Sequence, residues 1–372
     1  MSETSVGCTN LILLVVGLRE DEGEDMSVIN IGPYIRCKPG EKLYTWLPAT
    51  LPSSVSMPDG KAVQIPLIIV NGIEDGPGIG FFGAMHGDEL EGVQATCQIA
   101  EKLDPQEMKG TFFGIPVVNP SGYWARSRNN PDDNRNLNRV FPGKAEGTAS
   151  ERIAYAIYQY IVPQISCFMD YHAMGSRAWA ISTIHIRHYI HRELWEKTRQ
   201  IASICGFKYV SVIPGGVPNG MLDDINARDP EHGIPYISTE MSGVGTGYAE
   251  LDEKVKMCIR AGLNIMKHLR IIQGKPEIPE RATFISGGEW PTPPRPGPDL
   301  TKSGGWMFPY VEPADIVKKG QKLADLLDMF GTVVDSTYSP CDGIVHIMSS
   351  YPVIPRNSVP VRVAKFLSDE EL

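Results

Sequence analysis

The sequence predicts an α/β domain, in which helices cover a central sheet, followed by a small β domain. Short apolar segments alternate with helical segments from about residue 63 onward, as expected for strands that are buried on both faces. A proline-rich stretch begins near residue 274, and short strands with frequent glycine and proline turns follow it. We therefore divide the chain into an N-terminal β segment (1–60), an α/β domain (61–275), and a proline-rich connection with a small β domain (276–372).

The expected strands of the α/β domain are the apolar runs in VQIPLIIVNG, GIGFFGAMHG, GTFFGIPVVN, CFMDYHAMG and PYISTEMSG. Two of the segments between them have helical periodicity. Residues 91–103 place Val93, Cys97 and Ala100 on one face of a helix. The segment ASERIAYAIYQYIV begins near Ser150, which we expect to cap a second helix at its N-terminus.

The composition is that of a soluble globular protein. Hydrophobic residues make up 42% of the 372 and charged residues 21%, which indicates neither disorder nor a membrane protein. The run LILLVVGL at residues 11–18 is too short to span a bilayer, so we interpret it as an early strand or interface segment, with a signal peptide as the alternative. A formal net charge of −9 argues against binding nucleic acid, although a local arginine pocket could still hold a small anion. Seven scattered cysteines without a C-x-x-C motif indicate reduced thiols and a cytoplasmic protein.

The motif HGDE places a histidine at the end of a predicted strand. His86 follows the apolar run, Gly87 allows a tight turn, and Glu89 is expected in the first turn of the next helix. The carboxyl ends of strands in an open α/β sheet form the edge at which ligands bind. An imidazole and a carboxylate that converge there suit zinc, whose catalytic sites use three protein ligands and a water. The motif therefore predicts two metal ligands and requires a third.

His172 is the candidate third ligand, because it also ends an apolar strand and precedes a glycine-containing turn. Asp170 lies on the same face of that strand and could accept a hydrogen bond from the second imidazole nitrogen. Each motif alone fits chance, or a buried structural histidine, better than a metal site. Two such motifs that end buried strands of one domain favour the metal site.

The other histidines are expected to lie outside this site. His188 and His191 have an i,i+3 spacing that could hold a metal on a helix, but no acidic or cysteine partner shares a turn with them. We therefore place both, with His185, on a half-exposed surface. Three further histidines are treated as structural: His232, His268 and His346.

Arginines and asparagines gather between the two motifs, in residues 119–143. The segment holds four arginines, and five asparagines beyond its opening Asn119, so it is more polar than a core element. Guanidinium groups match carboxylates, and asparagine can hold a substrate amide or carboxylate. The segment therefore suggests an anionic substrate. For Arg126 and Arg135 we prefer a solvated surface position beside an acidic residue.

The motifs HGDE, LNRVFPG, DYH and STEMSG occur in the order seen in the succinylglutamate desuccinylase/aspartoacylase family, which the chain resembles over roughly residues 60–270. That family is related to the zinc carboxypeptidases. The resemblance implies a carboxypeptidase-like three-layer α/β/α domain with a mixed central sheet, and the tail is similar to the small β domain that these proteins append. It also implies one zinc ion per subunit, held by His86, Glu89 and His172.

The resemblance implies roles for four further residues. An Asn-Arg pair holds the substrate's free carboxylate in the family, and this pair corresponds to Asn138 and Arg139. An upstream arginine that polarises the scissile carbonyl corresponds to Arg128, ten residues before Asn138. The general base, which follows a late strand, corresponds to Glu240.

The run SRNNPDDNRNLNRVFPG looks closest to the branch that contains N-acetyl-diaminobutyrate deacetylases. The family commonly has Asp-Leu-His and a glycine-rich turn after the base, whereas this chain has Asp-Tyr-His and Met-Ser-Gly, so the acyl group stays open. We expect a homo-oligomeric zinc hydrolase that cleaves the amide bond of a small anionic N-acyl amino acid or a related carboxylate-bearing amide.

Two alternatives use the same fold: a zinc carboxypeptidase that acts on a peptide, and a catalytically silent binding protein. The intact set of ligands, base and arginines argues against the silent protein. A serine hydrolase would carry a G-x-S-x-G nucleophile elbow, which does not occur in the sequence. In the tail, SPCDGIVHIM lacks the lysine between methionines of a biotinyl carrier, so we expect a structural or oligomerising role for the β domain.

Overall fold

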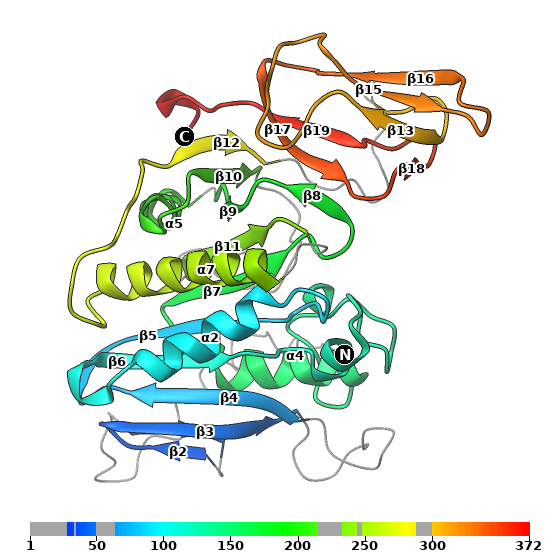
Figure 1. Ribbon diagram of the computed structural model, residues 1–372. Helices are drawn as coiled ribbons and strands as arrows, with labels where there is room; N and C mark the ends of the chain where they lie inside the picture. Colours follow the sequence, from blue (N-terminus) through cyan, green and yellow to red (C-terminus); the bar gives the residue numbers. More distant parts are fainter. Residues whose placement is uncertain are drawn as a thin grey trace, which may run out of the picture.

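The computed structural model describes residues 28–32, 35–49, 64–189, 191–214, 233–243, 248–287 and 300–372. Figure 1 shows a central sheet with helices on both faces and a β module at one end. Three features of the sequence lie outside the described residues: the apolar run at 11–18, His232, and all the prolines of the segment EWPTPPRPGPDL.

Within these ranges, nine strands form the central sheet, in the order β12-β10-β9-β11-β7-β5-β6-β4-β3. Their bounds are β3 Glu41–Pro48, β4 Gln64–Asn71, β5 Glu74–Phe82, β6 Lys109–Ile115, β7 Cys167–Ala173, β9 Thr183–Arg187, β10 Tyr209–Ile213, β11 Tyr236–Met241 and β12 Thr283–Ser286. Five neighbouring pairs are parallel and three are antiparallel, namely β3/β4, β4/β6 and β9/β11. The mixed sheet is therefore confirmed, and the five expected strands are β4, β5, β6, β7 and β11.

Apolar side chains on the two faces of the sheet form two separate cores. Phe81 and Met169 point into one core, whereas the adjacent Phe82 and Phe168 point into the other. The helices of the first core are α2 (Glu91–Lys102), α5 (Arg192–Ile204) and α7 (Tyr248–His268). The second core is closed by α4 (Ala149–Tyr160) and by the hairpin of β1 (Ile29–Ile31) with β2 (Ile35–Cys37). The expected three-layer α/β/α architecture is confirmed.

The predicted N-cap of α4 is wrong by two residues. Thr148 occupies the cap position, and its backbone N–H donates to Glu151 Oε2 at 2.9 Å. Ser150 lies inside the first turn, where its N–H and hydroxyl donate to Asp133 at 2.8 and 2.9 Å. Ser150 therefore anchors the arginine-rich segment to α4 instead of starting the helix.

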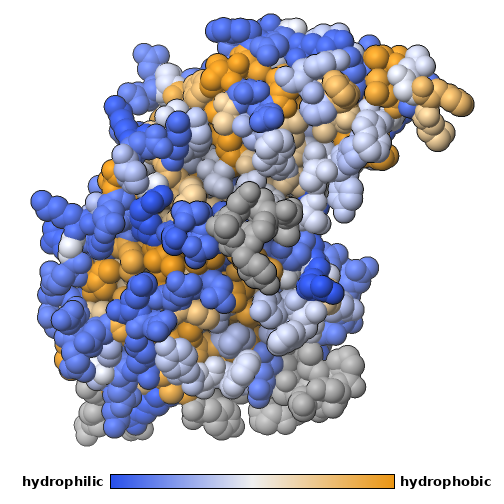
Figure 2. Space-filling view, in the orientation of Figure 1, coloured by the Kyte–Doolittle hydropathy of each residue, from blue (hydrophilic) through white to orange (hydrophobic). Residues whose placement is uncertain are grey.

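The C-terminal residues form a β module from two sheets of orders β16-β15-β13-β18 and β14-β17-β19. Their bounds are β13 Gly305–Pro309, β14 Ile316–Val317, β15 Lys322–Leu327, β16 Val333–Tyr338, β17 Gly343–Ser349, β18 Val353–Ile354 and β19 Val361–Ala364. Residues such as Met307, Leu326 and Val345 form its core. Figure 2 shows hydrophobic residues at the surface of the module, and Phe330, in the turn between β15 and β16, is 93% exposed.

The module packs on the half of the central sheet that contains β9, β10 and β12. Ile285 of β12 is buried together with Ile344 and Ala364 of the module. His185 of β9 is buried, and its ring centroid lies 5.9 Å from that of His346 in β17. The prediction of a half-exposed His185 is therefore wrong, because the module covers this strand.

The other two histidines of that group do not share a helix. His188 follows β9 and is exposed, and His191 is the N-cap residue of α5. Their i,i+3 spacing therefore does not place two imidazoles on one helix face.

Among the described cysteines, Cys37, Cys167, Cys205 and Cys258 are buried thiols. None of the described helices is long and apolar enough to cross a bilayer.

Candidate metal centre

The carboxyl ends of β5, β7 and β11 meet at one edge of the sheet, because these strands are parallel. His86 follows β5, His172 lies near the end of β7, and Glu240 of β11 is in register with His172. The turn after His86 is held against the arginine segment, since Gly87 N–H donates to Ser127 O at 3.0 Å. A Cβ at Gly87 would lie 1.9 Å from the backbone of Gly122, so this close approach requires glycine.

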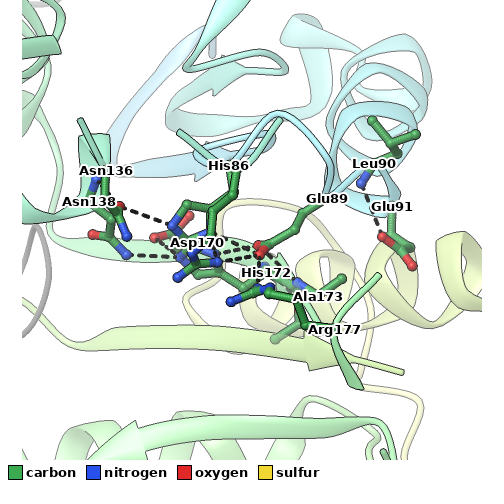
Figure 3. Close-up of polar contacts among 12 residues, drawn as sticks. His86, Glu89, Leu90, Glu91, Asn136, Asn138, Asp170, His172, Ala173 and Arg177 are labelled. Atoms are coloured by element: carbon green, nitrogen blue, oxygen red, sulfur yellow. Dashed lines mark hydrogen bonds and ion pairs between the residues drawn. The ribbon is translucent and has the colours of Figure 1, made fainter. Parts of the chain in front are cut away.

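His86, Glu89 and His172 are buried and converge on one point, as Figure 3 shows. His86 Nδ1 lies 2.9 Å from Glu89 Oε1, and His172 Nδ1 lies 2.8 Å from Glu89 Oε2. One donor atom from each residue lies within 4.8 Å of the other two. Glu89 stands in the turn before α2, which begins at Glu91, and so not in the first helical turn where we expected it. Two imidazole nitrogens and one carboxylate are a donor set that fits zinc.

The second nitrogen of each imidazole faces an oxygen that can orient the ring. Asp170 Oδ2 lies 2.9 Å from His172 Nε2, and Asn136 Oδ1 lies 3.2 Å from His86 Nε2. Each oxygen can accept an N–H, which directs Nδ1 of the same ring toward Glu89. Asn136 was not predicted as a site residue, and its only signal in the sequence is its place in the asparagine-rich segment.

Burial and charge set the protonation of the three ligand residues. Burial lowers the pKa of His86 to about 4, so its ring is neutral at pH 7. Burial opposes ionisation of Glu89, but His86 and His172 hold its pKa well below the usual value. Burial also disfavours a charged His172, yet the carboxylates of Asp170 and Glu89 raise its pKa well above the usual value. A metal ion bound at these atoms would therefore displace a proton from His172.

Glu240 and Arg128 lie beside this cluster. Burial raises the pKa of Glu240 to about 7, although the positive charges of His172 and Arg128 favour its ionised form. Arg128 Nη1 donates to Glu89 Oε1 at 3.0 Å and lies 3.0 Å from His86 Nδ1. A carboxyl group that titrates near neutral pH can both accept and return a proton, and a guanidinium beside it can stabilise negative charge.

The pair of the LNR motif lies in a short 3-10 helix, Leu137–Arg139. Asn138 is buried, and its side-chain amide nitrogen lies 3.3 Å from His172 Nε2. Arg139 is exposed, and its Nη1 donates to Asn138 O at 3.2 Å. Arg135 lies at the surface, as expected, where it pairs with Glu151 at 3.2 Å.

Arg177 is a site residue that the sequence analysis missed. Its Nη2 donates to Glu89 Oε1 at 3.2 Å (Figure 3). Arg128 contacts the same oxygen. It lies five residues after His172, in the turn that follows β7. An arginine in the turn after a ligand-bearing strand is the signal that could have identified it.

A comparison with known protein families matches the part of the chain that holds this site. Residues 75–264, just over half of the chain, match the family described as succinylglutamate desuccinylase/aspartoacylase catalytic domain. This chain belongs to that family. The matched residues include the whole His86–Glu89–His172 cluster together with Arg128, Arg177 and Glu240. The resemblance inferred from the four sequence motifs is confirmed.

Individual members of the succinylglutamate desuccinylase/aspartoacylase family share both sequence and fold with this chain. The N-alpha-acetyl-L-2,4-diaminobutyric acid deacetylase of Halomonas elongata is 28% identical over 220 residues, which are 59% of this chain and 62% of that protein. The chain thus matches less than two thirds of the length of this curated relative.

Solved structures of the family cover most of the chain. A succinylglutamate desuccinylase/aspartoacylase from Rhodobacter sphaeroides has a TM-score of 0.76 at 24% identity and covers 88% of this chain and 96% of its own. The product-bound ectoine utilization protein EutE (DoeB) of Ruegeria pomeroyi has a TM-score of 0.75 at 21% identity, with coverage of 90% and 98%. These structures support the fold over most of the chain, beyond the residues that the family match covers.

Proposed function

We propose that this protein is a zinc-dependent hydrolase that cleaves the amide bond of a small N-acyl amino acid or a related carboxylate-bearing amide. The observation that carries the proposal is the buried His86–Glu89–His172 cluster with the carboxyl group of Glu240 beside it. The description of the family and the name of the Halomonas elongata deacetylase support amide hydrolysis of an acyl amino acid.

The proposed mechanism assigns one task to each residue of the site. Zinc bound by His86, Glu89 and His172 would lower the pKa of a coordinated water toward about 7 and polarise a carbonyl group. Glu240 accepts the proton of the attacking water and passes it to the nitrogen of the leaving amine. Arg128 donates to the carbonyl oxygen, on which negative charge develops during the attack. The products are a carboxylate and a free amine.

The free carboxylate of the substrate is proposed to bind Asn138 and Arg139. Asn138 lies beside His172, and the guanidinium of Arg139 donates to Asn138 O, so a carboxylate held by these two residues would lie near the reacting amide. The arginine-rich segment also provides a positive region on a chain whose net charge is −9. A small anionic substrate suits both features.

The direct test is the release of amine from a panel of N-acetyl, N-succinyl and N-formyl amino acids. N-acetyl-L-2,4-diaminobutyrate belongs in the panel because of the relative that carries this name, and short peptides test the carboxypeptidase alternative. Each compound is assayed with zinc-loaded protein, chelated protein, and chelated protein resupplied with zinc. We expect release that disappears on chelation and returns with zinc. A folded, zinc-containing protein that releases no amine would contradict the proposal.

The proposed base predicts an acid limb in the pH profile. Glu240 must be ionised to accept a proton, and its pKa is raised to about 7. As the pH falls through that value, the carboxylate is protonated, so kcat/KM should decrease about tenfold per pH unit. A bound divalent cation favours the carboxylate and moves this limb below pH 7. A profile that stays flat from pH 7 to pH 4 in a protein that keeps its zinc would contradict this role of Glu240.

A further inference from the structure

The C-terminal module reaches the metal centre through one segment. Strand β8 (Ala178–Ala180) begins five residues after the end of β7, and it pairs with β17 of the module. The pairing sets Ala178 opposite Ser349 and Ala180 opposite Ile347. Met174, Ala178, Ala180 and Ile347 are also buried together. The chain that follows His172 is therefore held by the module.

Two hydrogen bonds fix the residues just before β8. Ser350 N–H donates to Arg177 O at 3.2 Å, and the Ser350 hydroxyl donates to Ser176 O at 2.5 Å. Arg177 N–H donates to Met174 O at 3.2 Å, which closes the turn. The backbone of Arg177 is thus hydrogen-bonded on one side to Met174, the residue after β7, and on the other side to the module.

The side chain of Arg177 points from this turn to the metal centre. Its Nη2 lies 3.2 Å from Glu89 Oε1, and 39% of its side chain is exposed to solvent. Its Nε is buried and has no hydrogen-bond partner among the described residues. Burial raises the pKa of both Glu240 and Asp88, and the positive charge of Arg177 opposes that rise. A guanidinium has five N–H donors, so this group retains donors for a ligand at the site.

We propose that Arg177 is a further catalytic residue, which binds the oxyanion formed during amide hydrolysis and the carboxylate of the released acid, and that the C-terminal module positions it. This inference rests on the proposed function. Arg128 and Arg177 contact the same oxygen of Glu89, so the substrate carbonyl meets two guanidinium groups at the site. Donors held in place before the reaction stabilise developing charge at little reorganisation cost. The planar fork of arginine also matches the two oxygens of a product carboxylate.

The test compares Arg177→Ala with the wild-type full chain, both zinc-loaded, with N-acetyl-L-2,4-diaminobutyrate as substrate and acetate as product inhibitor. We expect kcat to fall about 100- to 1,000-fold, the loss typical of one oxyanion donor, with the bound zinc per subunit unchanged. Inhibition by acetate should weaken in the same variant. Arg177→Lys should recover only part of kcat, because lysine keeps the charge but not the fork.

Three outcomes would overturn the inference. Loss of bound zinc in Arg177→Ala, with kcat restored by saturating zinc, would show that Arg177 only positions Glu89. Unchanged kcat and unchanged acetate inhibition would show that the residue does not contact the reacting group. If the wild-type protein releases amine from no acyl amino acid, both the proposed function and this inference are wrong. If the wild type is active and Arg177→Ala is equally active, only this inference is wrong.

The role of the module is tested by a matched pair of serine variants. Ser350→Ala removes the hydroxyl that holds Ser176 O, whereas Ser349→Ala removes a hydroxyl that bonds Tyr351 O within the module. We expect Ser350→Ala to lower kcat about 2- to 10-fold, the range of one net hydrogen bond, and Ser349→Ala to leave it unchanged. In the Arg177→Ala background, Ser350→Ala should have no further effect, because it acts through Arg177. Equal effects of the two serine variants, or an undiminished effect of Ser350→Ala in that background, would refute positioning by the module.

Discussion

Glu240→Gln is expected to lower kcat about 100- to 10,000-fold, the contribution typical of a general acid–base group. Glutamine keeps the size of the side chain but cannot accept a proton from the attacking water. Glu240 lies opposite His172 in the sheet and outside the cluster of three possible ligands, so the variant should keep its zinc. The measurements are steady-state turnover of N-acetyl-L-2,4-diaminobutyrate and zinc content by atomic absorption.

A matched control separates this effect from the loss of any surface acid. Glu253→Gln changes an exposed glutamate of α7 that pairs with Lys256, and it should leave kcat at the wild-type value. The acid limb of the pH profile should also disappear from the residual activity of Glu240→Gln. Turnover of this variant close to wild type would eliminate Glu240 as the base and leave the metal site without an assigned proton acceptor.

His172→Ala is expected to abolish both zinc binding and turnover. The substitution removes one of three ligand atoms, and it leaves Glu89 without the imidazole that lies 2.8 Å from its Oε2. A zinc site with two protein ligands is weaker than the three-ligand sites of hydrolases. Equilibrium dialysis against zinc, with His188→Ala as a control at an exposed histidine, measures the effect.

Asp170→Asn should have a smaller and graded effect. The amide keeps the shape but loses the negative charge that faces His172 Nε2 at 2.9 Å. Changes to residues that orient a metal ligand typically reduce affinity about 10- to 100-fold, so turnover should return at high zinc concentration. If His172→Ala binds zinc as tightly as the wild type, the proposed ligand set is wrong. If Asp170→Asn loses zinc binding as completely as His172→Ala, the carboxylate of Asp170 is needed for the fold itself.

The sequence predicted those parts of the site that follow a local pattern. His86 and His172 each end an apolar run, and the direction of a parallel strand brings both to one edge of the sheet. The helical period of the apolar residues likewise predicted α2, and continuous apolar runs predicted the strands β4, β5, β6 and β7. The local pattern gave the wrong cap residue at the N-terminus of α4, because Thr148, two residues before the expected Ser150, caps the helix.

Contacts between distant segments could not be read from such patterns. His185 looked like a surface residue, yet it is buried, because a strand about 160 residues later brings His346 against it. Arg177 and Asn136 were missed for the same reason. Their partners, Glu89 and His86, are 88 and 50 residues away in the sequence.

By itself, the sequence determined the class of fold, the family, and the residue types that converge at the strand ends, since each depends on local periodicity or on a short motif. Only the tertiary structure decided which nitrogen of each histidine faces Glu89, how far burial raises the pKa of Glu240, and that β8, the strand directly after Arg177, pairs with β17 of the C-terminal module. These properties depend on distances and burial between segments that the fold brings together, and such distances have no signature along the chain.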